Sequence, residues 1–150
     1  MGLSLRFGSL YQGQTVFQSL AEKMGQHSDL QVRMFLDVPR VHGDTSTIRT
    51  QIARFVRTFK TSQWPKGAPM PYVYCCEQIM ETQAGKSGSL HAKCIVVDNE
   101  NVFVSSANFT QAAQNRNIEV GLLVRSVVLS ERLTRFFEAL VDCYYFQRAI

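Results

Sequence analysis

The chain of 150 residues has the length of a single domain, which we expect to span residues 1–150, and it can bury a substantial core. Its apolar content of 45% and charged content of 19% exclude a disordered chain, and no apolar stretch approaches the roughly 18 residues of a membrane span. The net charge of +4 suits an anionic partner such as nucleic acid or a membrane surface, although many proteins of this charge bind neither.

The N-terminus and the cysteines are typical of a cytosolic protein. The opening residues, MGLSLRFG, lack the basic stretch and apolar run of a signal peptide, so we expect a cytoplasmic location. The four cysteines form no CxxC pair, which favours reduced thiols over a zinc site or disulfides. We therefore expect no metal ion and no other cofactor.

Strands and helices alternate in the first half of the chain. Residues 3–10 and 31–38 read as strands, and a helix is expected between them from about residue 15 to 24. A loop at residues 41–47 precedes a second, basic amphipathic helix. The apolar stripe of this helix consists of Ile48, Ile52, Phe55, Val56 and Phe59.

The opposite side of that second helix is basic, and it has two interpretations. Plain solvated surface is favoured, and a groove for nucleic acid is the alternative. The basic residues are Arg49, Arg54, Arg57 and Lys60. Three aromatic residues farther along, Trp64, Tyr72 and Tyr74, could stack on bases or pack inside the protein.

The second half is richer in strands. We expect strands at 72–76, 90–98, 102–105 and 118–124, with a tight turn making an antiparallel hairpin of the middle two. A last helix is expected from about 127 to 146. Its expected core face is Leu129, Leu133, Phe136, Phe137, Leu140, Val141 and Tyr144. This order predicts an α/β fold, a layered α/β/α sandwich with a mixed sheet whose helix-linked strands are parallel.

The chemistry of the chain is concentrated in the run LHAKCIVVD and the SSANFT that follows it. His91 and Lys93 are two residues apart, so in a strand they project from one face. A histidine can serve as nucleophile or base while an ammonium group holds an anionic oxygen. Ser105, Ser106 and Asn108 add the small neutral donors that a phosphate requires. This set fits metal-free chemistry at phosphorus.

The spacing of these residues resembles the HKD motif of the phospholipase D superfamily, HxK(x)4D(x)6GSxN. The matching positions are His91, Lys93, Asp98, Ser106 and Asn108. The pattern departs at Ser105, where the family usually has glycine, although a further hydroxyl is compatible with a phosphate pocket. Asn117 and Glu119 match the Asn-x-Glu that many members carry after the motif.

The sequence around the motif narrows this resemblance. SLHAKCIVVD, SSANFTQAAQNRNIEVG and LYQGQTVFQSLAE are similar to the phospholipase-D-like protein of DISARM-type anti-phage defence systems. The resemblance covers nearly all of the chain. It implies a phospholipase-D-like fold and, by family, metal-independent cleavage of nucleic acid in phage defence. It also implies a further N-terminal segment in relatives, so we expect a short or truncated member with one motif.

The resemblance assigns a role to each matching residue. His91 is expected to attack phosphorus and form a phosphohistidine, while Lys93 and Asn108 hold the non-bridging oxygens. Ser106 is expected to donate a further hydrogen bond or to steady its loop. Glu119 is expected to orient a catalytic imidazole through Nδ1.

Three further positions have supporting roles. Asp98 is expected to shape the turn and pair locally rather than to contact substrate. Asn117 is expected to support the site, and Ser105 to bind substrate beside Ser106.

The single motif creates a difficulty, because the family uses one histidine as nucleophile and a second as general acid. The other histidines, His27 and His42, have no lysine two residues on. A homodimer with two-fold symmetry would bring His91 of both subunits to one shared site, and Glu119 could serve either subunit. The further expected partners are nucleic acid and other defence proteins, and no membrane is expected.

The main hypothesis is thus a dimeric, metal-independent phosphodiesterase that cleaves DNA or RNA in phage defence. One alternative is a nucleic-acid-binding subunit with a degenerate site, which Ser105 and the single motif keep open. A phospholipase is disfavoured by the absence of a signal peptide and of an amphipathic membrane helix.

Overall fold

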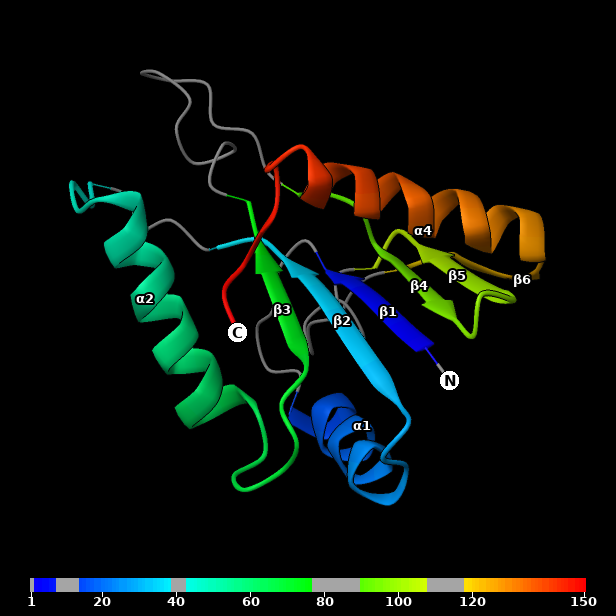
Figure 1. The fold of residues 1–150 in the computed structure, drawn as a ribbon, viewed down its shortest axis with the longest axis horizontal. Helices are drawn as coiled ribbons and strands as arrows, with labels where there is room; N and C mark the ends of the chain where they lie inside the picture. The colour runs from blue at the N-terminus through cyan, green and yellow to red at the C-terminus, as the bar shows by residue number, and fades with distance from the viewer. Residues whose placement is uncertain (1, 8–13, 39–42, 77–89, 108–117) are drawn as a thin grey trace.

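The computed structural model describes residues 2–7, 14–38, 43–76, 90–107 and 118–150, and within them a mixed sheet forms the centre of the molecule (Figure 1). Its strand order is β6-β5-β4-β1-β2-β3-β7. The strands are β1 (Gly2–Phe7), β2 (Gln31–Leu36), β3 (Tyr72–Cys75), β4 (Cys94–Val97), β5 (Asn101–Ser105), β6 (Gly121–Arg125) and β7 (Gln147–Arg148). The helices are α1 (Gln14–Gln26), α2 (Ile48–Thr58), with a π-helical turn at Phe59–Gln63, and α4 (Val127–Asp142).

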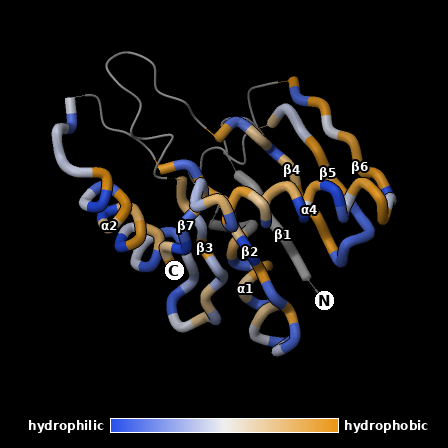
Figure 2. Tube along the Cα trace, turned by 45° about the horizontal axis from the view of Figure 1, so that its top comes forward, coloured by the Kyte–Doolittle hydropathy of each residue, from blue (hydrophilic) through white to orange (hydrophobic). Residues whose placement is uncertain are grey.

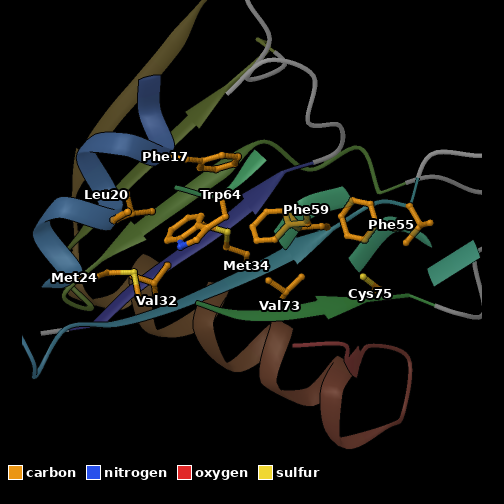
Figure 3. Close-up of a cluster of buried hydrophobic side chains, with 13 residues drawn as sticks. Phe17, Leu20, Met24, Val32, Met34, Phe55, Phe59, Trp64, Val73 and Cys75 are labelled. Carbon is orange, nitrogen blue, oxygen red and sulfur yellow. The ribbon is translucent and has the colours of Figure 1, made fainter. Parts of the chain in front are cut away.

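The sheet lies between two layers of helices, so the expected α/β/α sandwich is confirmed. Helices α1 and α2 cover one face, which we call the α1/α2 face, and α4 lies on the opposite α4 face (Figures 1 and 3). The helix-linked pairs β1–β2 and β2–β3 are parallel, and the β4–β5 hairpin is antiparallel, as predicted. Strand β1 joins the two halves because it pairs with β2 on one side and antiparallel with β4 on the other.

The core beneath α1 and α2 is aromatic (Figure 3). The ring of Phe17 from α1 lies 5.9 Å from that of Phe59 and 5.6 Å from that of Trp64, measured between centroids. Trp64 is buried, and its indole N–H donates to the carbonyl of Pro69 at 3.0 Å. Of its two interpretations, packing is therefore the correct one. The predicted apolar stripe of α2 faces this core as expected.

The residues that α4 buries differ in part from the core face that the sequence predicted for this helix. Phe137 packs against Phe35 of β2 at 4.9 Å, but Phe136 is 56% exposed and Tyr144 75% exposed, so their assignment to the core was wrong. Adjacent residues on a helix point about 100° apart, so Phe136 cannot share the buried side of Phe137. Leu129 is also at the surface. The helix ends at Asp142, and Tyr144 has a positive φ of 58°, a left-handed backbone that closes a helix.

The β4–β5 hairpin has a turn with an uncommon backbone. Asp98 and Asn99 both have φ of 52°, and the amide of Glu100 donates to the carbonyl of Val97 at 3.0 Å. Two consecutive left-handed residues suit the right-handed twist of a hairpin, and Asp and Asn tolerate them well. Asp98 thus lies in this turn, and its role in shaping the turn stays a prediction.

Candidate active site at the edge of the sheet

The candidate residues lie where β4 begins and β5 ends. The expected strand at 90–98 is shorter than predicted, because β4 starts at Cys94 and both His91 and Lys93 precede it. Register places Cys94 opposite Arg6 of β1 and opposite Val104 of β5. The carboxyl ends of the parallel strands β1, β2 and β3 reach this same edge, which is where open α/β sheets usually place ligands.

His91 and Lys93 contact each other directly. The Nζ atom of Lys93 lies 3.0 Å from Nδ1 of His91, and it also donates to the carbonyl oxygen of His91 at 3.0 Å. His91 is exposed, whereas Lys93 is only 7% exposed. An ammonium group can only donate, so Nδ1 acts as the acceptor and the proton of a neutral imidazole is on Nε2. A charged lysine is thereby held beside an accessible imidazole.

Ser106 and Glu119 form the second part of the site. The hydroxyl of Ser106 donates to Oε2 of Glu119 at 2.6 Å, the short distance typical of a charged acceptor. The same hydroxyl accepts from the amide of Val120 at 3.1 Å, and the amide of Ser106 donates to the carbonyl of Val120 at 3.0 Å. Glu119 precedes β6, which begins at Gly121 rather than at the expected residue 118. These bonds fix the carboxylate of Glu119 at the end of β5.

Ser105 connects the two parts. Its amide donates to the carbonyl of Lys93 at 2.9 Å, which places the two residues opposite each other across the hairpin. Its hydroxyl accepts from the amide of Ala107 at 3.0 Å and lies 3.4 Å from the carbonyl of Val120. The serine that replaces the family's glycine therefore bonds to its own turn.

Asp98 and His27 are not brought to this group. Asp98 is five residues beyond Lys93, a separation of roughly 17 Å at the rise per residue of a strand. It follows the last residue of β4 and so lies at the opposite end of that strand from Lys93. His27 lies near that far edge too, where it lines a pocket of about 390 Å³ with Val97 and Asp98. Asn108, Asn117 and His42 are outside the described residues.

Sequence reasoning missed two features of this site. The backbone of Val120 bonds to Ser106 in both directions, and only the register of β5 and β6 reveals it. The contact of Lys93 with Nδ1 was also missed, because spacing shows a shared face but not a hydrogen bond. In the described ranges, no group of three or more His, Cys, Asp or Glu side chains could hold a metal ion, and no helix could cross a membrane.

Comparison with known families gives a match over most of the chain. The family described as cardiolipin synthase, PLD-like domain, matches residues 9–141. The chain belongs to this PLD-like family. The candidate residues 91–107 and Glu119 fall inside the matched range.

Solved structures of the superfamily share the fold. NucT from Helicobacter pylori has a TM-score of 0.64 at 15% identity, covering 94% of this chain and 79% of its own. Nuc from Salmonella typhimurium, a phospholipase D family member, has a TM-score of 0.54 at 16% identity, covering 99% and 81%. Phosphatidylserine synthase from Haemophilus influenzae has a TM-score of 0.67 at 14% identity, covering 99% and 34%.

One curated relative is similar in sequence. The DISARM protein DrmC of Bacillus paralicheniformis is 39% identical over an alignment of 61 residues, with a coverage of 35% of this chain and 25% of the relative. The match therefore spans a quarter of the relative's length. The predicted relation to a DISARM phospholipase-D-like protein is thus confirmed at the level of a partial match.

Proposed function

We propose that this chain is a metal-independent phosphodiesterase that cleaves DNA or RNA through a phosphohistidine at His91. The observation that carries the proposal is the contact at 3.0 Å between the buried ammonium of Lys93 and the exposed imidazole of His91. This pair lies at the sheet edge beside the Ser106–Glu119 hydrogen bond. A nucleophile, a cation and a fixed carboxylate are the parts that metal-free phosphoryl transfer requires.

In the first step of the proposed reaction, the substrate displaces the contact between Lys93 and Nδ1 of His91. A non-bridging phosphate oxygen takes the ammonium away from Nδ1 of His91, and that nitrogen becomes free to carry the ring proton. A carboxylate then accepts a hydrogen bond from Nδ1–H, which leaves a lone pair on Nε2. We assign this carboxylate to Glu119, from the same or a partner subunit, because Ser106 already orients it.

Bond formation follows in two balanced steps. Nε2 of His91 forms a bond to phosphorus as the bond to the leaving oxygen breaks, and a second histidine, in its imidazolium form, gives that oxygen a proton and becomes neutral. Water then attacks the phosphohistidine, the same second histidine takes its proton, and His91 is released unchanged. Lys93 and Asn108 hold the non-bridging oxygens, and Ser105 and Ser106 support the phosphate.

The second histidine is proposed to come from a homodimer. Two of the three histidines, His27 and His42, lack a lysine two residues on, and His27 lies near the far edge of the sheet. A two-fold axis beside the site would supply His91 of the partner subunit. His91 of each subunit would then act as the nucleophile in half of the turnovers.

We propose that the substrate is nucleic acid. We also propose that the protein acts in phage defence, in the cytoplasm. Support comes from the partial match to the DISARM protein DrmC and from a net charge of +4. The basic residues of α2 add to this, because they are exposed. Other defence proteins are proposed as partners on the same ground. Asn117 and Asp98 are proposed to support the site's architecture without touching substrate.

A cleavage assay in excess EDTA tests this function. Labelled single- and double-stranded DNA and RNA would be incubated with wild type, His91→Asn and His27→Asn. We expect wild type and His27→Asn to cleave at least one substrate, and His91→Asn to be inactive. His27 is a matched control because it is an exposed histidine distant from the site. Cleavage that EDTA abolishes, or that His91→Asn retains, would overturn the proposal.

A nucleic-acid-binding subunit without turnover is the second candidate. The observation that favours it is the same contact, because an imidazole that accepts at Nδ1 carries its proton on Nε2 and is not a nucleophile there. The serine at position 105, where the family usually has glycine, also favours a site that binds without turnover. Tight binding of an oligonucleotide by wild type without cleavage, at any pH between 5 and 9, would establish this role.

A further inference from the structure

Positive charge is concentrated on one helix of the molecule, α2. Residues 45–76 contain five basic side chains and no acidic one, so this stretch alone exceeds the net charge of +4 of the whole chain. The basic residues are Arg49, Arg54, Arg57, Lys60 and Lys66. By contrast, α1 carries one basic and one acidic residue, and α4 carries two basic and three acidic residues. The excess charge of the chain is thus local to α2 and the segment that follows it.

Three of these basic side chains lie in one row on the solvent side of α2. The opposite side of the helix packs on the core through Phe55 and Phe59, and Figure 2 shows hydrophilic and hydrophobic positions alternating along α2. Arg49, Arg57 and Lys60 are all exposed. At the turn of an α-helix they fall within roughly 80° of one another and extend over roughly 16 Å. We call these three side chains the basic row.

Within the described residues, no acidic side chain forms an ion pair with the basic row. Of the basic residues of α2, Arg54 has such a partner, with Nη1 lying 2.7 Å from Asp44. Arg57 and Lys60 are neighbours at a spacing of three residues, and Arg49 is in the first turn, where the helix dipole disfavours a cation. A surface that only meets water usually intersperses both signs of charge. The uncompensated row therefore indicates an anionic partner.

The basic row begins at the edge of the sheet that carries the candidate site. Helix α2 follows the carboxyl end of β2, which reaches that edge, and it runs back alongside β3 (Figure 1). Its core lies over β2 and β3, on the α1/α2 face. Strand β2 is separated from β4 by β1 alone, so two strand spacings, about 10 Å, lie between β2 and β4. An extended ligand at the site can therefore continue across this edge to the start of α2.

The composition of the row suits a phosphate backbone. An anionic membrane is disfavoured, because a helix that binds a lipid surface inserts an exposed apolar side, whereas the apolar side of α2 is buried in the core. Stacking on bases is disfavoured as well, because Phe55 and Phe59, the aromatic residues of this helical segment, are buried. Arginine and lysine that contact phosphates bind without reading sequence.

We infer that the basic row of α2 is a second contact for nucleic acid, which holds the sugar-phosphate backbone beyond the scissile bond. The inference deepens the proposed function and rests on it in one respect, namely that the substrate is nucleic acid. Binding through the row is independent of sequence. It favours long substrates over short ones, because only a long strand reaches both the site and the row.

Two charge-removal variants test this surface by binding. Arg49→Gln/Arg57→Gln removes two charges from the row, and Arg132→Gln/Arg135→Gln removes two from α4, on the opposite face. The second is a matched control, because both variants have the same net charge and glutamine suits a helix about as well as arginine. Affinity for a labelled duplex of about two turns would be measured against salt concentration, in a His91→Asn background that leaves the duplex intact.

We expect the row variant to bind at least tenfold more weakly than its parent at about 0.1 M salt, and to lose the preference for long duplexes. The slope of log K against log salt concentration should fall in magnitude by about two, as for the loss of two phosphate contacts. The α4 variant should bind within about twofold of its parent. Arg49→Lys/Arg57→Lys, which keeps both charges, should retain most of the affinity.

The outcomes separate this inference from the proposed function. Equal losses in the row and α4 variants, or no loss in the row variant, would overturn the inference. Binding of wild type to vesicles of anionic lipid, but to no nucleic acid, would overturn it too. A protein that binds duplex through the row and never cleaves would uphold the surface and refute the nuclease. Cleavage of long substrates in EDTA with the same KM in wild type and both Gln variants would refute the surface and leave the nuclease standing.

Discussion

The ammonium of Lys93 and Nδ1 of His91 are joined by a hydrogen bond of 3.0 Å, and this bond fixes the ring tautomer before substrate arrives. The proton of a neutral ring is then on Nε2, so this nitrogen has no lone pair with which to attack phosphorus. In a symmetric dimer both histidines would start in this state. Binding of one phosphate would then change one of them, which gives a physical reason for two identical histidines to take different roles.

Nitrogen NMR of the His91 ring tests this tautomer. In wild type at a pH where the ring is neutral, we expect Nε2 to show the shift of a protonated nitrogen and Nδ1 that of an acceptor. Lys93→Met removes the donor, so the ring should move toward a mixture of tautomers. Cleavage should fall about 10²- to 10³-fold, as for loss of one group that stabilises developing charge. A wild-type ring with its proton on Nδ1 would contradict the contact.

Ser106 and Ser105 should differ in their effect on activity. Ser106→Ala removes the donor to Glu119 at 2.6 Å and leaves the carboxylate unfixed, so we expect a loss of activity of tenfold or more. Ser105→Gly restores the family's residue and removes hydroxyl bonds within the turn. It should cost about 1 kcal/mol of stability and lower activity by less than Ser106→Ala does. Steady-state kinetics and urea unfolding of both variants measure this contrast, and a reversed order would refute the assignment.

Gly121 should resist any larger side chain. A Cβ at this position would lie 2.8 Å from two ring carbons of Phe103, closer than such atoms approach. We expect Gly121→Ala to lower the free energy of unfolding by about 1–3 kcal/mol, as for overpacking. The double variant Gly121→Ala/Phe103→Leu should recover part of this loss, because a smaller side chain relieves the contact. Strict additivity in the double-mutant cycle would show that the ring is not the cause.

Asp44 should make stability depend on pH in the acid range. Hydrogen bonds from Ser46, followed by the guanidinium of Arg54 at 2.7 Å, lower the pKa of Asp44 from 3.8 to about 2. A carboxylate with a lowered folded pKa adds stability that is present above pH 3.8 and is lost as the pH falls toward 2. The free energy of unfolding of wild type and of Asp44→Asn, measured between pH 5 and 2, tests the contribution of Asp44. The two curves should converge as the pH falls, and parallel curves would contradict it.

The sequence predicted the layers of the fold better than the ends of its elements. Periodicity identified α2 and the strands beneath it, because Phe55 and Phe59 must face one side of a helix to be buried. It did not identify where α4 ends, since the left-handed backbone of Tyr144 leaves no trace in hydrophobicity. Phe136 was wrongly predicted to be buried, because its hydrophobicity does not distinguish it from the adjacent, buried Phe137.

The sequence proposed the members of the candidate site but not the hydrogen bonds among those that the structure describes. Spacing placed His91 and Lys93 together, the donor chemistry of the following run added Ser106, and the resemblance added Glu119. The bond from Ser106 to Glu119 depends on the register of β5 against β6, which no local pattern encodes. The contact between Lys93 and Nδ1 depends on a rotamer, which is likewise set by packing. The assignments of Asn108 and Asn117 stay predictions, because both lie outside the described residues.

Trapping the covalent intermediate tests directly whether His91 forms a phosphohistidine. Wild-type protein would be mixed with an end-labelled oligonucleotide in EDTA, quenched with alkali, in which phosphohistidine is stable, and digested for mass spectrometry. We predict a nucleotide adduct on the peptide that contains His91, and no adduct in His91→Asn. Steady cleavage by wild type with no adduct on that peptide, or an adduct on the peptide that contains His27, would contradict it.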